Sequence, residues 1–223
     1  QPTDTLDFNA TAFFNVVEDK IVSRNFLCTT NDCSNFNSNV TSYSKSFNAD
    51  EAEIYGLETS LKYQIIPEWD IKAAYTYMES EITKGENKGS YLSNVPKNAF
   101  NMTSTWHINP AMDVWLQHEY KSERKRYNTE QTSGDAALIY KATGNKLNGY
   151  NLFNLGANYS LSDNVRITGA VNNLLDKDFT KNGSYTDANG DPASYYDYMV
   201  IGSGMSGTYL PGRNYWLSIS YDF

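Results

Sequence analysis

Apolar and polar residues alternate along most of the chain, most clearly in YWLSISYDF at residues 215–223. Tyr215, Leu217, Ile219, Tyr221 and Phe223 share one face of the predicted strand, and the opposite face holds Trp216, Ser218, Ser220 and Asp222. Similar stripes recur within residues 6–14, 55–63, 71–77, 100–108, 153–161 and 165–171. The pattern predicts about eight strands, each near the roughly 10 residues that a tilted strand needs to cross a bilayer.

Short and long connections alternate between these segments. Turn-forming Pro67, Pro110 and Asn164 mark short turns, whereas the long polar segments cover residues 28–47, 83–96, 128–148 and 175–211. An up-and-down outer-membrane barrel has this arrangement, with short periplasmic turns and long extracellular loops. For a single strand, a packed soluble core is the simpler interpretation. Eight strands with sorted loops and an Asn-, Ser-, Thr-, Glu- and Lys-rich second face favour a transmembrane β-barrel with a polar interior.

Composition supports strands and excludes several classes of protein. The 18 Tyr, 10 Phe and 4 Trp favour β-structure and supply aromatic residues for the membrane interfaces. The mean hydropathy is -0.58, and no apolar run reaches the roughly 18 residues of a membrane-spanning helix. A net charge of -8 argues against nucleic acid as a partner. The first residues contain no export signal, so we expect that the signal was removed or that the chain begins within a longer protein.

Two cysteines and several aspartates are the residues that could act as metal ligands. Cys28 and Cys33 enclose the polar segment CTTNDC, which favours a small disulfide-closed loop over a metal site. Asp187, Asp191 and Asp197 do not have the spacing of an EF-hand calcium loop. The sequence therefore predicts a disulfide and no metal site.

Four segments carry a resemblance to a known family: FNATAFFNVVEDKI, AEIYGLETSLKY with IPEWDIKAAYTYMES, VRITGAVNNLLDKDF, and the terminal LPGRNYWLSISYDF. With these segments the chain resembles the C-terminal barrel region of TonB-dependent outer-membrane receptors, closest to those for ferric enterobactin and other catecholate siderophores. The resemblance implies an all-β, antiparallel barrel of about 22 strands around an N-terminal plug. Residues 1–223 would then be about the last eight strands, without the signal peptide, plug and earlier strands.

The resemblance also implies what the protein does and what it contacts. Receptors of this family lie in the bacterial outer membrane and import ferric siderophores with energy from the TonB complex, which contacts the N-terminal part. The expected partners are therefore the ferric siderophore, membrane lipid and lipopolysaccharide, the plug and upstream strands, and TonB. The siderophore itself holds the iron, so no cofactor is expected in this segment.

Ferric catecholates are anionic and aromatic, and this chemistry selects two candidate sites. Cations and aromatic rings suit such a ligand, and KSERKRYN supplies Arg124, Lys125, Arg126 and Tyr127 where a strand enters a long loop. The alternatives for this basic run are simple exposure to solvent or contact with lipopolysaccharide phosphates. The second candidate is the Tyr- and Gly-rich last loop, which contains Tyr185, Tyr195, Tyr196, Tyr198 and Tyr209. The alternative is that these tyrosines pack the loop onto itself.

Two other functions are alternatives to that of a receptor. An enzyme is disfavoured because the two histidines, His107 and His118, flank a periplasmic turn and no nucleophile motif is present. A self-contained eight-stranded barrel with a structural or adhesive role is compatible with the number of strands alone. The sequence upstream of this chain would distinguish that barrel from a receptor.

Overall fold

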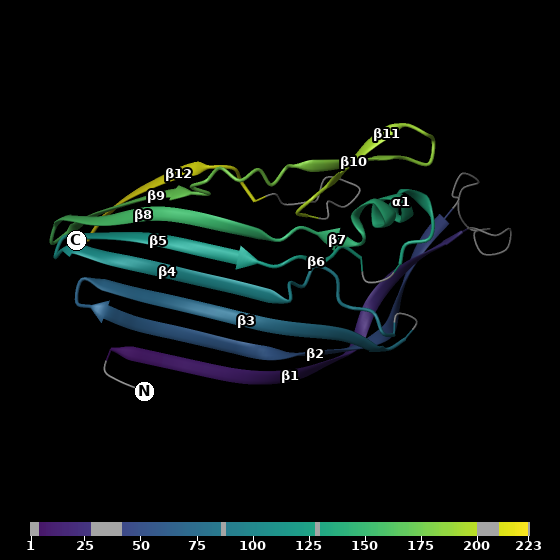
Figure 1. Cartoon of the computed structure of the whole chain (residues 1–223), viewed down its shortest axis with the longest axis horizontal. Coiled ribbons are helices and arrows are strands. Elements are labelled where there is room, and N and C mark those ends of the chain that lie inside the picture. The colour runs from purple at the N-terminus through teal and green to yellow at the C-terminus, as the bar shows by residue number, and fades with distance from the viewer. Residues whose placement is uncertain (1–4, 28–41, 86–87, 128–129, 200–209, 223) are drawn as a thin grey trace.

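Eight antiparallel strands form one continuous sheet, as the computed structural model of the chain shows (Figure 1). The structure describes residues 5–27, 42–85, 88–127, 130–199 and 210–222, with 19–27 and 42–50 described by their backbone. Neighbours in the sheet are successive in the chain, apart from small elements inserted in the long connections. The strands are β1 Leu6–Leu27, β2 Ser42–Ile66, β3 Trp69–Lys84, β4 Asn98–Asn109, β5 Met112–Lys121, β8 Tyr150–Ser162, β9 Val165–Asn172 and β12 Asn214–Tyr221. The predicted all-β, up-and-down architecture is confirmed.

The connections are sorted between the two ends of the sheet, as predicted. Residues 67–68, 110–111 and 163–164 form two-residue turns at one end, the left in Figure 1. The opposite end carries the long connections 85–97, 122–149 and 173–213. They contain β6 Arg124–Lys125, α1 Gly134–Thr143, β7 Lys146–Leu147, β10 Asn182–Thr186 and β11 Pro192–Tyr196. Following the usual outer-membrane arrangement, we name these two ends the turn end and the loop end.

The first long connection is shorter than the sequence indicated. Residues 28–47 were predicted as a loop, but β2 begins at Ser42, which pairs with Leu27 of β1. Hydrogen bonding across the hairpin extends both strands into a polar segment. That segment lacks the alternating apolar residues that would predict a strand. Irregular pairing between Val17 and Ile21 marks where the ribbon departs from the regular sheet.

One face of the sheet is apolar and exposed. Register pairs such as Phe8 with Leu61 and Ile167 with Ile219 place apolar side chains side by side on this face. Leu217 is 70% exposed and Tyr215 75% exposed, a large cost in water but a favourable state against lipid. Trp69 and Trp106 stack on the same face near the turn end, with ring centroids 6.2 Å apart. We name this face the outer face, and the stacked pair fits an aromatic girdle at the membrane interface.

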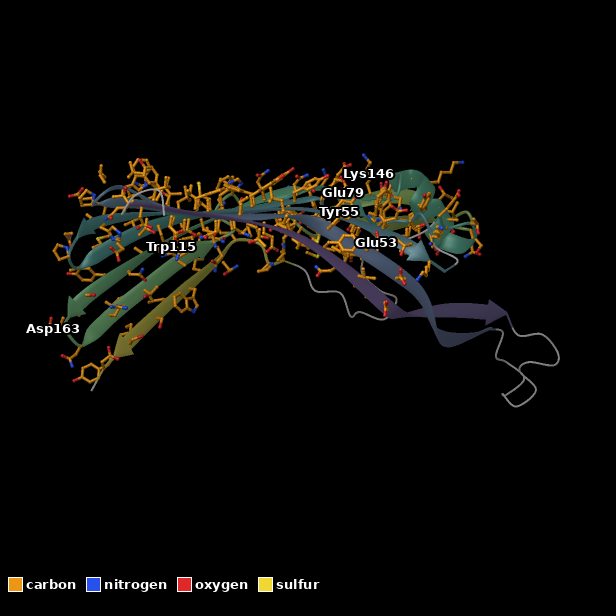
Figure 2. The ribbon with its side chains drawn as sticks, turned by 90° about the horizontal axis from the view of Figure 1, so that it is seen from below. Glu53, Tyr55, Glu79, Trp115, Lys146 and Asp163 are labelled. Atoms are coloured by element: carbon orange, nitrogen blue, oxygen red, sulfur yellow. The ribbon has the colours of Figure 1, made fainter. Side chains whose placement is uncertain are left out.

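The opposite, inner face is mostly polar and also carries large aromatic side chains over glycines. Trp115 pairs with Gly156, and a Cβ added to Gly156 would lie 2.2 Å from the indole. Phe13 packs over Gly56 in the same way. The strands at the two edges of the sheet bend to the same side in Figure 2. This curvature suits a section of barrel wall.

The described residues bury few apolar side chains within the sheet itself. Tyr150, Phe179 and Tyr198 instead form a cluster at the loop end, with Leu152, Met199 and Leu210 packed against it. Among the described residues, no helix is long and apolar enough to cross a membrane. The packed core of this chain therefore lies where the loops meet the sheet.

Candidate functional site at the loop end

A pocket of about 420 Å³ opens where three loop-end segments meet. Its walls come from the end of β3, the 85–97 connection, and the segments around β6 and β7: Met78, Glu79, Ser80, Tyr91, Leu92, Val95, Lys97, Asn98, Ser122, Glu123, Arg124, Lys125 and Lys146. Four of these side chains are cationic and two are anionic. The pocket is therefore basic in a chain whose net charge is -8.

The four cations differ in whether a carboxylate neutralises them. Lys97 lies 2.5 Å from Glu79, and Lys146 lies 3.0 Å from Glu123. Arg124 and Lys125 form no ion pair within the part of the chain that the structure describes. The uncompensated positive charge of the pocket thus comes from these two adjacent residues of β6.

Arg124 is held between two loops. Its Nε donates to Asn94 Oδ1 at 2.9 Å, and its Nη2 donates to the carbonyl of Tyr198 at 2.5 Å. Its Nη1 is buried and has no partner among the described residues. Burial lowers the pKa of the guanidinium from its usual range, but arginine remains charged in proteins. Arg124 therefore contributes a positive charge to the pocket wall, and one of its guanidinium nitrogens stays buried without a described partner.

Arg126 is more deeply buried and contacts the last loop. Its Nη2 donates to the carbonyl of Tyr196 at 2.5 Å, and the guanidinium lies 5.4 Å from the ring centroid of Tyr195. The side chain is only 6% exposed, its Nε has no described partner, and burial lowers its pKa. Arg126 thus joins the 122–149 and 173–213 connections, and it does not line the basic pocket.

The neighbouring predicted residues differ in their surroundings. Lys125 Nζ lies 6.0 Å from the ring centroid of Tyr91, which is half-exposed. Tyr127 stacks on Tyr140 of α1 at 6.4 Å, and burial raises the pKa of its phenol. Its backbone exchanges two hydrogen bonds with the side chain of Asn145. Lys125 therefore lies in the pocket wall beside a half-exposed ring, and Tyr127 is integrated into the loop.

The tyrosines of the last loop also divide into two groups. Tyr198 packs edge-on against Phe179, and Lys177 donates to its hydroxyl at 3.0 Å. Tyr195 faces Arg126 and lies 6.4 Å from Tyr185. Tyr198 therefore shows the self-packing considered for this loop, and ligand contact by the tyrosines stays a prediction. Tyr209, Cys28 and Cys33 lie outside the described residues.

Asparagines with positive φ were missed in the sequence, although they fix the loops. Asn173 is 2% exposed, has φ 52°, and its amide nitrogen donates to the carbonyls of Lys177 and Pro211. Its side-chain oxygen accepts from the Lys177 N–H. These bonds join the start of the last connection to its end, so the segments NNLLDKDF and LPGR contact each other. The residue type itself could have indicated these positions, because Asn tolerates the left-handed conformation better than most other side chains.

Helix α1 was also missed. It begins after Ser133, ends at Gly144 in the left-handed conformation with φ 58°, and carries Asp135 and Lys141 at the favourable ends of its dipole. The helix lies inside a segment that was predicted as one long loop. The described residues contain no group of three or more His, Cys, Asp or Glu arranged to hold a metal ion.

Comparison with known proteins agrees with this architecture. The sequence matches the family "TonB dependent receptor-like, beta-barrel" over residues 1–174. It is 27% identical over 214 residues to the iron-regulated outer membrane virulence protein of Vibrio cholerae serotype O1, covering 96% of this chain and 28% of that protein. It is 28% identical over 180 residues to the ferrienterobactin receptor of Escherichia coli K12, covering 79% and 22%. The chain therefore spans about a quarter of the length of these relatives.

Solved structures show the same fold. The chain superposes on a ferric enterobactin receptor, PfeA of Pseudomonas aeruginosa, with a TM-score of 0.69 and 23% identity, covering 99% of this chain and 29% of that one. The copper transporter OprC gives a TM-score of 0.65 at 20% identity, covering 99% and 30%. The family match and the outer-membrane relatives support an outer-membrane location and a receptor rather than an enzyme. This chain belongs to the β-barrel family of TonB-dependent outer-membrane receptors.

Proposed function

We propose that this chain forms part of an outer-membrane receptor for the TonB-dependent uptake of ferric siderophores, specifically of the catecholate class. The relatives include an iron-regulated outer membrane protein and a ferrienterobactin receptor. Because the chain spans only about a quarter of their length, the transport activity belongs to a longer protein. The plug, the upstream strands and the TonB contact would come from the remainder of that protein.

The observation that carries the catecholate assignment is the uncompensated charge beside an aromatic ring in the loop-end pocket. Arg124 presents a buried, unused N–H, and Lys125 lies over Tyr91. A ferric catecholate has negative charge on its oxygens and flat aromatic rings. Charge-assisted hydrogen bonds from Arg124 and contacts with Tyr91 would match both properties.

The predicted residues receive different roles in this proposal. Arg124 and Lys125 would contact the ligand, together with Tyr91. Arg126, with its partners in the last loop, would hold the loops in position around the pocket. Tyr127, Tyr195, Tyr196, Tyr198 and Tyr209 remain candidates for ligand contact, and the predicted Cys28–Cys33 disulfide would restrict the first loop.

Equilibrium binding tests the ligand class. The purified full-length receptor is titrated with ferric enterobactin and with ferrichrome, a neutral hydroxamate complex, while intrinsic tryptophan fluorescence is followed. We expect saturable quenching by ferric enterobactin at submicromolar concentration and none by ferrichrome. Equal binding of both complexes would contradict the catecholate assignment, and binding of neither would contradict the siderophore function.

The same titration with variants tests the pocket. Lys125→Ala is expected to weaken ferric enterobactin binding about tenfold, since it removes one uncompensated charge from a partly desolvated site. Lys141→Ala is the matched control, because Lys141 is an exposed lysine on α1 that does not line the pocket. Unchanged affinity in Lys125→Ala would contradict ligand contact by Lys125 and would favour another role for it, such as contact with lipopolysaccharide phosphates.

A further inference from the structure

His107 lies between two carboxylates on the inner face, close to the turn end of the sheet. Its Nδ1 is 2.7 Å from Asp113 Oδ1, and its Nε2 is 3.0 Å from Asp70 Oδ2. The three residues come from three adjacent strands, with Asp70 on β3, His107 on β4 and Asp113 on β5. We name them the His107 cluster.

Counting protons in this arrangement gives a chemical constraint. A neutral imidazole has one N–H donor and one acceptor nitrogen, whereas an ionised carboxylate only accepts. Both ring nitrogens of His107 face carboxylate oxygens. A neutral imidazole with two ionised carboxylates has one N–H for these two contacts, so both can be hydrogen bonds only if the cluster holds one more proton. An imidazolium satisfies both carboxylates without protonating either of them.

The surroundings of the cluster contain both signs of charge. Two pockets border His107: Asp7, Lys62 and Lys72 line the first, and Glu68 lines the second beside Asp113. Asp70 Oδ1 is buried and has no described partner, which adds negative potential beside the ring. The His107 side chain is 42% exposed, so protons can exchange with water.

The cluster lies near the turn end of the wall, beside the stacked tryptophan pair of the outer face. Trp106 on the outer face, stacked on Trp69, precedes His107 by one residue, and β4 ends two residues later at Asn109. The His107 backbone N–H donates to the carbonyl of Glu68 in the β2–β3 turn, at 2.8 Å. The side chain and the backbone of His107 thus both hold β4 to its neighbours at the turn end.

We propose that His107 is an imidazolium at neutral pH and that it joins β3, β4 and β5 by a proton-dependent contact at the turn end. This contact is separate from ligand capture at the loop end. It is complete while the imidazole is protonated and both carboxylates are ionised. It is lost as rising pH removes the imidazolium proton.

Nitrogen NMR of the full-length receptor in lipid bilayers, with nitrogen-15-labelled histidine, tests the protonation state. The His107 signals are assigned by their loss in His107→Gln. At about pH 7 we expect both ring nitrogens to show the resonances of protonated nitrogen. One protonated and one unprotonated ring nitrogen at this pH would overturn the proposal.

A second variant tests the carboxylates without removing the histidine. Asp113→Asn replaces one carboxylate by a neutral amide, so we expect the imidazole to lose its second proton at lower pH than in the unchanged receptor. His118 provides an internal comparison, because it stacks on Phe153 on the outer face, and its one hydrogen bond within the described part of the chain is to the Asn151 amide oxygen. An identical titration of His107 in the variant would show that Asp113 does not hold the proton there.

Discussion

At the residue scale, the loop end depends on arginines that donate to main-chain carbonyls. Arg124 and Arg126 reach the carbonyls of Tyr198 and Tyr196 in the last connection. Neither guanidinium has a carboxylate partner among the described residues, and each has a buried nitrogen without a hydrogen bond. Burying such groups costs free energy. The hydrogen bonds to the two carbonyls therefore offset only part of that cost, and both arginines hold the last connection against β6 and the residue that follows it.

Removing the Arg126 side chain should loosen the last loop. Arg126→Ala deletes the hydrogen bond to Tyr196 and the contact with Tyr195, and hydrogen bonds to charged groups contribute about 1.5–3 kcal/mol. We expect faster proteolytic cleavage within residues 173–213 of the intact receptor, with the barrel still inserted. Lys141→Ala is the control, and equal cleavage rates in both variants would contradict the role of Arg126.

The inner-face glycine at position 156 makes a second residue-scale prediction. Gly156→Val would place its Cβ 2.2 Å from the Trp115 ring and 2.9 Å from the Gly169 carbonyl. Such overpacking costs about 1–3 kcal/mol, so the receptor should unfold at lower urea concentration. The control is Gly169→Ala, whose nearest neighbour would be a Leu217 methyl group at 3.7 Å. Equal unfolding midpoints for the two variants would contradict the close packing of Trp115.

At the element scale, each strand separates an outer apolar face from an inner polar one. In β12, Leu217 pairs with Gly169 on the outer face and Ser218 pairs with Thr168 on the inner face. The strict period of two made these strands and their two-residue turns predictable from sequence. α1, β6, β7, β10 and β11 were not predicted, because their short polar segments are stabilised by loop contacts rather than by a repeating apolar stripe.

Adjacent substitutions in β12 should have opposite consequences. Leu217→Arg places a charge against lipid, which costs up to about 4 kcal/mol depending on depth, whereas Ser218→Arg places it against the polar interior. We expect Leu217→Arg to reduce the amount of folded receptor in outer membranes, measured by heat-modifiable migration in gels. Ser218→Arg should assemble at close to the normal level. The reverse order of assembly would show that the outer face is assigned wrongly.

At the scale of the whole molecule, the chain is a curved section of wall with its loops gathered at one end (Figures 1 and 2). The basic run at residues 124–126 was identified from its charge together with the anionic ligand that the family resemblance implies. Its contact with residues 196 and 198, and the contribution of Tyr91 to the pocket, could not be predicted. These contacts join positions far apart in sequence, and they depend on how three connections fold over one another rather than on a local pattern.

Iron uptake tests the account most directly. Cells that lack other catecholate receptors express the full-length receptor, and uptake of radiolabelled iron is measured below saturation with the unchanged protein, Lys125→Glu and Lys141→Glu. The account predicts uptake from ferric enterobactin, a loss of about tenfold or more in Lys125→Glu, and a normal rate in Lys141→Glu. Absence of uptake by the unchanged receptor, or equal rates in both variants, would contradict it.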